Sequence, residues 1–287
     1  MRKVDCLIVS TARAASTSMY HYLNDIGGLC LPANKEPHFW CDVEKYSGRY
    51  SLLDELYIGE TSRYEELYRE SKIVVDASVG YFFYIDDVIS KLREFRQKPK
   101  ALFLYREPTS RAASLFNELR RKGIEEETTL EKALTAAKNR SPGRWWEHYY
   151  DNVQYDRVFE SMCNYFDEIL AVNLDAIQTS PEETVGGVLR FLEIAPVRTI
   201  EYLPMNTSNG AILSMKLKRL RRISPFIPRG LKTTIRHFLS RFSRSGDTRG
   251  KENASGDVSE MLSMSVASYK KFRSAVQEKD IYDSRNR

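Results

Sequence analysis

Small, hydroxyl and cationic side chains gather where the first apolar stretch of the sequence ends. The run VDCLIV at 4–9 leads directly into STARAASTS at 10–18. Ala14 and Ala15 are small enough to let backbone N–H groups approach a ligand, and Arg13 offers a planar, charged fork. A strand, a tight turn and a helix start of this composition predict a site for phosphate or sulfate. The hydroxyls at the helix start are Ser16, Thr17 and Ser18.

A second anion-binding pattern follows a later apolar run. The stretch ALFLY at 101–105 ends at Arg106, and Ser114 lies about two helical turns further on. An arginine at a strand end and a hydroxyl on the next helix can converge on one phosphate. The alternative is that Arg106 pairs with Glu107 or Asp76 and that Ser114 is an ordinary helix residue.

A third group of chemically capable residues is KEPHFW at 35–40. Glu36 offers a carboxylate and His38 an imidazole, and both groups can move protons. Lys35 and Trp40 could line a ligand site next to them, because a flat aromatic face suits a sugar ring. Packing of the aromatic residues within a loop is an equal alternative.

The elements that must position these residues alternate between strand and helix. Short continuous apolar runs are typical of parallel strands that are buried on both faces. The pattern predicts an α/β fold, a three-layer sandwich with a central parallel sheet and a P-loop-like strand, loop and helix at its start. Strands are expected at 4–9, 73–75, 101–105 and 168–173; helices at 16–26, 85–95, 108–119, 129–137, 151–166, 181–192 and 258–277; and an excursion over the sheet edge at 29–70.

Charge is distributed unevenly along the chain. The net charge is +5, yet residues 211–251 hold twelve Lys or Arg and a single acid, Asp247. We therefore expect a core at 1–210, a basic, partly amphipathic arm at 211–257 and a C-terminal helix at 258–287 that packs back on the core. The four cysteines have neither disulfide nor zinc spacing, and no secretory leader or membrane-spanning run is apparent, so a cytoplasmic location is expected.

The basic arm allows two interpretations. Apolar residues fall on one helical face and basic residues lie largely off it, so residues 216–244 could rest on an anionic membrane at its inner face. A solvated basic helix docked on the sheet explains the pattern equally well. Nucleic acid is not an expected partner, because no reader motif accompanies the charge.

The three chemical segments together resemble the sulfotransferase superfamily, which uses 3′-phosphoadenosine 5′-phosphosulfate (PAPS). KEPHF at 35–39 is similar to the heparan-sulfate and carbohydrate sulfotransferase branch and its bacterial relatives. The resemblance implies sulfuryl transfer from PAPS to a hydroxyl or amine of a carbohydrate or glycolipid, with no metal. It places the 5′-phosphosulfate at 13–18 and the 3′-phosphate at Arg106 and Ser114, with Tyr155 as a further donor-binding residue. Glu36 becomes the base, and Arg13 stabilises the bridging oxygen.

Two departures from the family pattern qualify this resemblance. Arg13 stands where many members of the branch have lysine. VDASVGY at 75–81 resembles an acid-Lys-Ser-Pro-x-Tyr motif, but it has Ala77 and Val79 in place of Lys and Pro. Tyr81 in this motif is a candidate acceptor-binding residue. The loss of a cation at Ala77 keeps open a catalytically degenerate module that binds nucleotide or glycan.

A nucleotide kinase-like P-loop protein is a further alternative. Such a protein needs the pattern GxxxxGK[ST], and this chain has no glycine between residues 1 and 26. No lysine stands directly before the serine and threonine group either, where the motif requires one.

Overall fold

A parallel sheet forms the centre of the fold, with strand order β2-β3-β1-β4-β5. The structure is a computed structural model that describes residues 3–14, 16–24, 26, 28–32, 36–41, 57–68, 73–121, 123–139, 153–195 and 256–278. The described residues belong to one compact unit, which residues 1–202 and 256–287 form. The strands are β1 (Cys6–Ser10), β2 (Leu29–Cys30), β3 (Ile73–Ala77), β4 (Lys100–Tyr105) and β5 (Ile169–Asn173).

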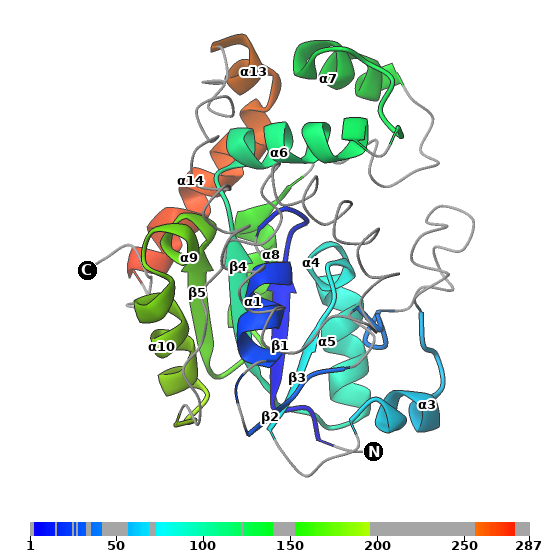
Figure 1. Cartoon of the computed structure of the whole chain (residues 1–287), viewed down its shortest axis with the longest axis vertical. Helices are drawn as coiled ribbons and strands as arrows, with labels where there is room; N and C mark the ends of the chain where they lie inside the picture. Colours follow the sequence, from blue (N-terminus) through cyan, green and yellow to red (C-terminus); the bar gives the residue numbers. More distant parts are fainter. Residues whose placement is uncertain are drawn as a thin grey trace, which may run out of the picture. The chain divides into compact units, whose positions relative to one another are not determined.

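The register of the sheet brings several strand ends to one edge. Ser10 pairs with Leu104 across β1 and β4, and Tyr105 pairs with Asn173 across β4 and β5. All strand pairs are parallel, so the carboxyl ends of β1, β3, β4 and β5 lie on the same side (Figure 1). In an open parallel sheet this is the side that binds ligands.

Helices cover both faces of the sheet, which confirms the predicted α/β fold (Figure 1). Side chains along each strand alternate between two buried clusters: Leu7 and Val9 face one, and Cys6 and Ile8 face the other. Two covered faces explain why the strands read as continuous apolar runs. The helices are α1 (Ser16–Asn24), α3 (Thr61–Glu66), α4 (Gly80–Phe83), α5 (Ile85–Glu94), α6 (Pro108–Arg121), α7 (Leu130–Asn139), α8 (Tyr155–Cys163), α9 (Leu174–Thr179), α10 (Pro181–Phe191), α13 (Gly256–Met261) and α14 (Ser263–Glu278).

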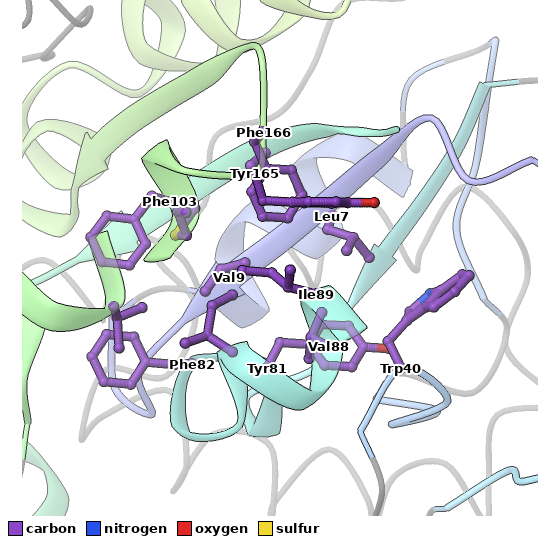
Figure 2. Close-up of a cluster of buried hydrophobic side chains, with 14 of the residues drawn as sticks. Leu7, Val9, Trp40, Tyr81, Phe82, Val88, Ile89, Phe103, Tyr165 and Phe166 are labelled. Atoms are coloured by element: carbon purple, nitrogen blue, oxygen red, sulfur yellow. The ribbon is translucent and has the colours of Figure 1, made fainter. Parts of the chain in front are cut away.

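The larger cluster joins α4, α5, α8 and α14 to one face of the sheet. Figure 2 shows part of it, with Phe82 and Phe103 among its buried rings. Helix α14 completes this face, because Phe272 has no exposed surface and packs against Phe103 and Tyr155. The other face is covered mainly by α1 and α10.

The structure differs from the expected elements in several places, and the short helix α4 is one that was not expected. The excursion at 29–70 contributes an edge strand, β2, and a short helix, α3. Helix α9 was not expected, because six residues are too short for a helical period to stand out. The C-terminal helix expected at 258–277 is two helices, α13 and α14, separated by a turn at Leu262.

Residues 196–255 lie outside the described residues, and they include all of the basic arm except its last two positions, 256 and 257, which begin α13. The domain boundaries at 210 and 257 and the membrane contact at 216–244 therefore stay predictions. Within the part of the chain that the structure describes, no helix has the length and apolar character needed to cross a membrane.

Candidate functional site

The turn after β1 lies at the carboxyl edge of the sheet and leads into α1. It is closed by a hydrogen bond from the backbone N–H of Ala14 to the carbonyl of Thr11, at 3.3 Å. Arg13 has a φ of 69°, in the left-handed region that non-glycine residues rarely adopt. Ser16 opens α1, so its hydroxyl lies at the helix N-terminus. Ala15 lies outside the described residues.

The second anion-binding segment meets this turn. Nε of Arg13 donates a hydrogen bond to Oγ of Ser114 at 3.0 Å. NH1 of Arg106 is 3.4 Å from the carbonyl oxygen of Arg13 and donates to it. The Tyr155 hydroxyl donates to the Arg106 carbonyl at 2.8 Å and lies 3.4 Å from Oγ1 of Thr11. The structure thus brings together Arg13, Arg106, Ser114 and Tyr155.

The electrostatics of this cluster favour an anion. Burial lowers the pKa of Arg106 below its ordinary value, and the nearby charge of Arg13 lowers it further, while Asp175 acts in the opposite direction. The guanidinium groups nevertheless stay charged at neutral pH. Nε of Arg106 is buried and has no hydrogen-bond partner. A buried cation with a spare donor fits a phosphate or sulfate oxygen.

The alternative partners of Arg106 are hydrogen-bonded elsewhere. The Glu107 carboxylate accepts hydrogen bonds from the backbone N–H groups of Thr109 and Ser110, at 2.9 and 2.7 Å, at the start of α6. Burial alone would raise the pKa of Glu107, but a hydrogen bond from the Thr109 hydroxyl and these two backbone hydrogen bonds lower it below its ordinary value. Glu107 therefore caps α6, and Asp76 accepts hydrogen bonds from two tyrosines.

Glu36 and His38 lie beside the carboxyl end of β3. The backbone N–H of His38 donates to Oγ of Ser78, the residue after β3, at 3.1 Å. Nε2 of His38 is 3.7 Å from Oε2 of Glu36. The His38 side chain has no exposed surface, and neither of its ring nitrogens has a hydrogen-bond partner. The pair is therefore held at the same edge of the sheet as the arginine cluster.

Asp76 is a buried acid close to this pair, and the sequence did not lead us to expect it as a site residue. Oδ2 of Asp76 accepts hydrogen bonds from the hydroxyls of Tyr64 and Tyr81, at 2.7 and 2.8 Å, while Oδ1 has no hydrogen-bond partner. Burial raises the pKa of Asp76 to about 6, although the tyrosines and the nearby His38 lower it. The feature of the sequence that could have indicated it is an aspartate within the otherwise apolar strand IVVDA.

Two of the residues expected to bind the acceptor, Trp40 and Tyr81, are buried in the core. Trp40 has no exposed surface, and its indole N–H donates to the Tyr64 hydroxyl at 3.0 Å. Tyr81 is also fully buried, and Figure 2 shows both side chains within the apolar cluster. These contacts support the packing alternative that the sequence left open for Trp40. Lys35 lies outside the described residues. No metal-binding group of three or more His, Cys, Asp or Glu occurs among the described residues.

No protein-family model matches the chain, and no curated protein matches it. Among solved structures, a sulfotransferase from Alicyclobacillus acidocaldarius is 18% identical; the match covers 79% of this chain and 96% of that one, with a TM-score of 0.62. Mouse sulfotransferase SULT7A1 complexed with PAP is 18% identical over 75% of this chain and 65% of its own, with a TM-score of 0.44. The likeness to the bacterial structure shows that this chain has the sulfotransferase fold.

Proposed function

We propose that this chain is a PAPS-dependent sulfotransferase that transfers a sulfuryl group to a hydroxyl or amine of a carbohydrate or glycolipid. The fold supports the class of enzyme. The similarity of residues 35–39 to the carbohydrate branch supports the class of acceptor. A cytoplasmic location, with the arm at 216–244 on an anionic membrane, is the setting that we propose for it.

One observation carries the proposal: the hydrogen bond between Arg13 and Ser114. These residues belong to two separate anion-binding patterns, 101 positions apart in the sequence. Their contact supports the proposal that the two patterns form one site, as a donor with phosphate groups at both its 3′ and 5′ positions requires. Arg106 joins the same site through the Arg13 carbonyl.

The chain's own residues fit such a donor. Ser16 and Thr17 offer hydroxyls at the N-terminus of α1, where helix N–H groups stabilise negative charge. Arg106 holds a buried, unpartnered Nε, and Tyr155 fixes the carbonyl of Arg106. PAPS supplies a sulfuryl group bonded to a phosphate that leaves as it is transferred. The protein's contribution is mainly to hold the reactants in line and to stabilise charge on the leaving phosphate.

Glu36 is the proposed base. The acceptor's O–H or N–H bond breaks as its oxygen or nitrogen bonds to sulfur, and the proton passes to the Glu36 carboxylate. The Glu36 side chain is 19% exposed, so it can reach a substrate, whereas the His38 side chain has no exposed surface. His38 is therefore in place to position Glu36 or to share its proton.

A second candidate function rests on Ala77. This residue is buried at the end of β3 and packs with the cluster that faces α1, so position 77 supplies no cation to the site. A chain that binds the donor nucleotide without transferring the sulfuryl group would fit this loss. Transfer activity distinguishes the two candidates.

The testing experiment is calorimetric titration with 3′-phosphoadenosine 5′-phosphate (PAP), the product nucleotide. We expect micromolar binding to the wild-type protein and loss of binding in the Arg106→Ala and Ser114→Ala double variant. Absence of binding to a folded wild-type protein would contradict the proposal. Incubation with sulfur-labelled PAPS and a panel of glycans and glycolipids then follows. Label in an acceptor identifies an enzyme, and binding without transfer identifies the degenerate module.

A further inference from the structure

Asp76 and His38 are two buried polar side chains that meet the same tyrosine. Neither residue has exposed surface. The His38 ring lies edge to face with the Tyr81 ring, with centroids 6.4 Å apart, and the Tyr81 hydroxyl donates to Oδ2 of Asp76 at 2.8 Å. Oδ1 of Asp76 and both ring nitrogens of His38 have no hydrogen-bond partner. Buried polar atoms without partners cost free energy, so their retention calls for a role other than packing.

The end of β3 supports the segment that carries Glu36 and His38. Ser78 Oγ accepts the hydrogen bond from the backbone N–H of His38 at 3.1 Å. A Cβ on Gly80 would lie 2.8 Å from Nδ1 of His38. The other ring nitrogen, Nε2, lies 3.7 Å from Oε2 of Glu36. His38 therefore links the end of the strand that contains Asp76 to the proposed base.

The charges around Asp76 make His38 a suitable counter-ion for it. Burial raises the pKa of Asp76 to about 6, while hydrogen bonds from Tyr64 and Tyr81 and the charge of His38 act in the opposite direction. Other titratable groups that face Asp76 stay neutral near pH 7, because burial raises their pKa values above the ordinary ones. These groups are Tyr64, Tyr68, Tyr81 and Cys41. His38, in contrast, can become positively charged in this pH range.

Helix α5 brings one acid and one base to the same region. Burial raises the pKa of Cys41, and Asp87 raises it further, whereas Lys91 lowers it. Lys91 also donates to the carbonyl of Phe39 and lies 3.9 Å from the centroid of the Phe39 ring. Because the charges of Asp87 and Lys91 have opposite sign, we expect their effects on Asp76 to oppose each other.

We propose that Asp76 is a positioning residue for the transfer: its carboxylate keeps His38 protonated, and the imidazolium holds the Glu36 carboxylate ionised and in place for the acceptor. The inference rests on the proposed function, in which Glu36 takes the acceptor's proton. Two carboxylates near one imidazole favour its charged form, because each opposite charge stabilises it. The placement of Glu36 then depends on the ionisation of a fully buried residue.

The test measures label transfer from PAPS at two pH values in wild type and Asp76→Asn, with an acceptor found in the screen. Asparagine has the shape of the protonated acid and keeps an oxygen for the two tyrosines. We expect the variant to be about tenfold less active than wild type at about pH 8, where Asp76 is ionised. At about pH 5, where Asp76 is protonated, the two should agree within about twofold. The matched control is Asp86→Asn, an exposed acid at the start of α5, which should follow wild type at both.

An equal loss at both pH values would indicate a merely structural role and overturn the inference, and so would no loss at either. If Asp76→Asn fails to fold, Tyr81→Phe decides. This variant keeps the ring beside His38 but removes one hydrogen bond to the ionised carboxylate, so the fall in activity toward acid must move to higher pH. An unmoved fall would overturn the inference.

Nitrogen NMR of the histidine rings at about pH 7 gives a second readout that needs no acceptor. The His38 signal is assigned by its loss in His38→Gln. We expect a larger neutral fraction of this ring in Asp76→Asn than in wild type, and an unchanged fraction would overturn the inference. A wild-type protein that neither binds PAP nor transfers label would instead reject the proposed function, whatever the NMR shows.

Discussion

Nε2 of His38 lies 3.7 Å from a carboxylate oxygen of Glu36, and both residues adopt left-handed backbone conformations, with φ of 52° and 70°. Such conformations cost roughly 1 kcal/mol or more for residues other than glycine, and they are retained where the surrounding structure holds them. Arg13 is a third case, with a φ of 69°. The three residues that the sequence selects for catalysis are thus all strained in this way.

Replacing Glu36 by Gln removes the proposed base while keeping its size. We expect turnover to fall by about two to four orders of magnitude, because a positioned base contributes this much to proton transfer. Affinity for PAP should change less than about twofold, since Glu36 is not one of the proposed donor ligands. The measurement is label transfer from PAPS to an acceptor found in the screen. Glu94→Gln, an exposed acid on α5, is the control. Normal turnover in Glu36→Gln would show that another group takes the proton.

Gly80 has no Cβ, and this leaves room for the ring of His38. A Cβ at this position would lie 2.8 Å from Nδ1 of His38 and 3.4 Å from Sγ of Cys41. Because the ring is enclosed, Gly80→Ala must displace it and disturb Glu36. We expect at least about a tenfold loss of transfer with PAP binding retained.

Gly186→Ala is the matched control for this substitution. A Cβ at Gly186 would meet only NH1 of Arg190, at 3.6 Å, within helix α10. Alanine is favoured over glycine in a helix by about 1 kcal/mol, so this variant should be as active as wild type and at least as stable. Full activity in Gly80→Ala would mean that the position of His38 has no bearing on transfer.

Asp76 should make the stability of the protein depend on pH. Its pKa is raised from 3.8 to about 6 on folding, mainly by burial. The folded state therefore binds more protons than the unfolded state between these values, and stability falls as pH rises through them. The loss of stability from ionising Asp76 is absent below about pH 3.8. It is complete above about pH 6, where it amounts to about 3 kcal/mol.

Asp76→Asn removes this titration while keeping an oxygen for Tyr64 and Tyr81. The free energy of unfolding of the variant, relative to wild type, should rise by about 2 to 3 kcal/mol between pH 4 and pH 7.5. Urea denaturation of both proteins at the two pH values measures the difference. A difference that is the same at both would mean that Asp76 titrates alike in the folded and unfolded chain.

The sequence predicts the elements of this fold better than their long-range contacts. Strand β1 and the turn at Arg13 could be placed because a continuous apolar run and small residues act locally. The same holds for β4 and the start of α6, where Arg106 follows an apolar strand. The hydrogen bond from Arg13 to Ser114 depends on how α6 lies across the sheet edge, which no local pattern encodes.

Asp76, which is buried, is a second residue whose role could not be predicted from local sequence. Its role depends on Tyr64, which belongs to the weakly periodic stretch at 29–70 and packs over β3. Trp40 belongs to this group too, since it donates to Tyr64. An aromatic residue beside a candidate base looks alike in sequence whether it stacks on a sugar or supports the core. Only the tertiary packing distinguishes the two cases.

Phe272 anchors the C-terminal helix α14 against the aromatic rings of β4 and α8. Its ring centroid lies 4.9 Å from that of Tyr105 and 5.2 Å from that of Phe103, and it stacks on Tyr155 at 5.7 Å. Phe272→Ala would leave a cavity among these rings and should lower the free energy of unfolding by about 3 to 5 kcal/mol. The control is Met264→Ala on the same helix, where the residue is 65% exposed and little change is expected.

Phe272→Ala should also weaken PAP binding, although residue 272 is not one of the proposed donor ligands. The Tyr155 hydroxyl holds the carbonyl of Arg106, so loss of the ring stacked on Tyr155 loosens that arginine. Urea denaturation gives the stability, and calorimetric titration of the folded variant gives the affinity. A stability loss below about 1 kcal/mol would contradict the packing of α14 described above. Unchanged PAP affinity alongside a large stability loss would separate that packing from the geometry of Arg106.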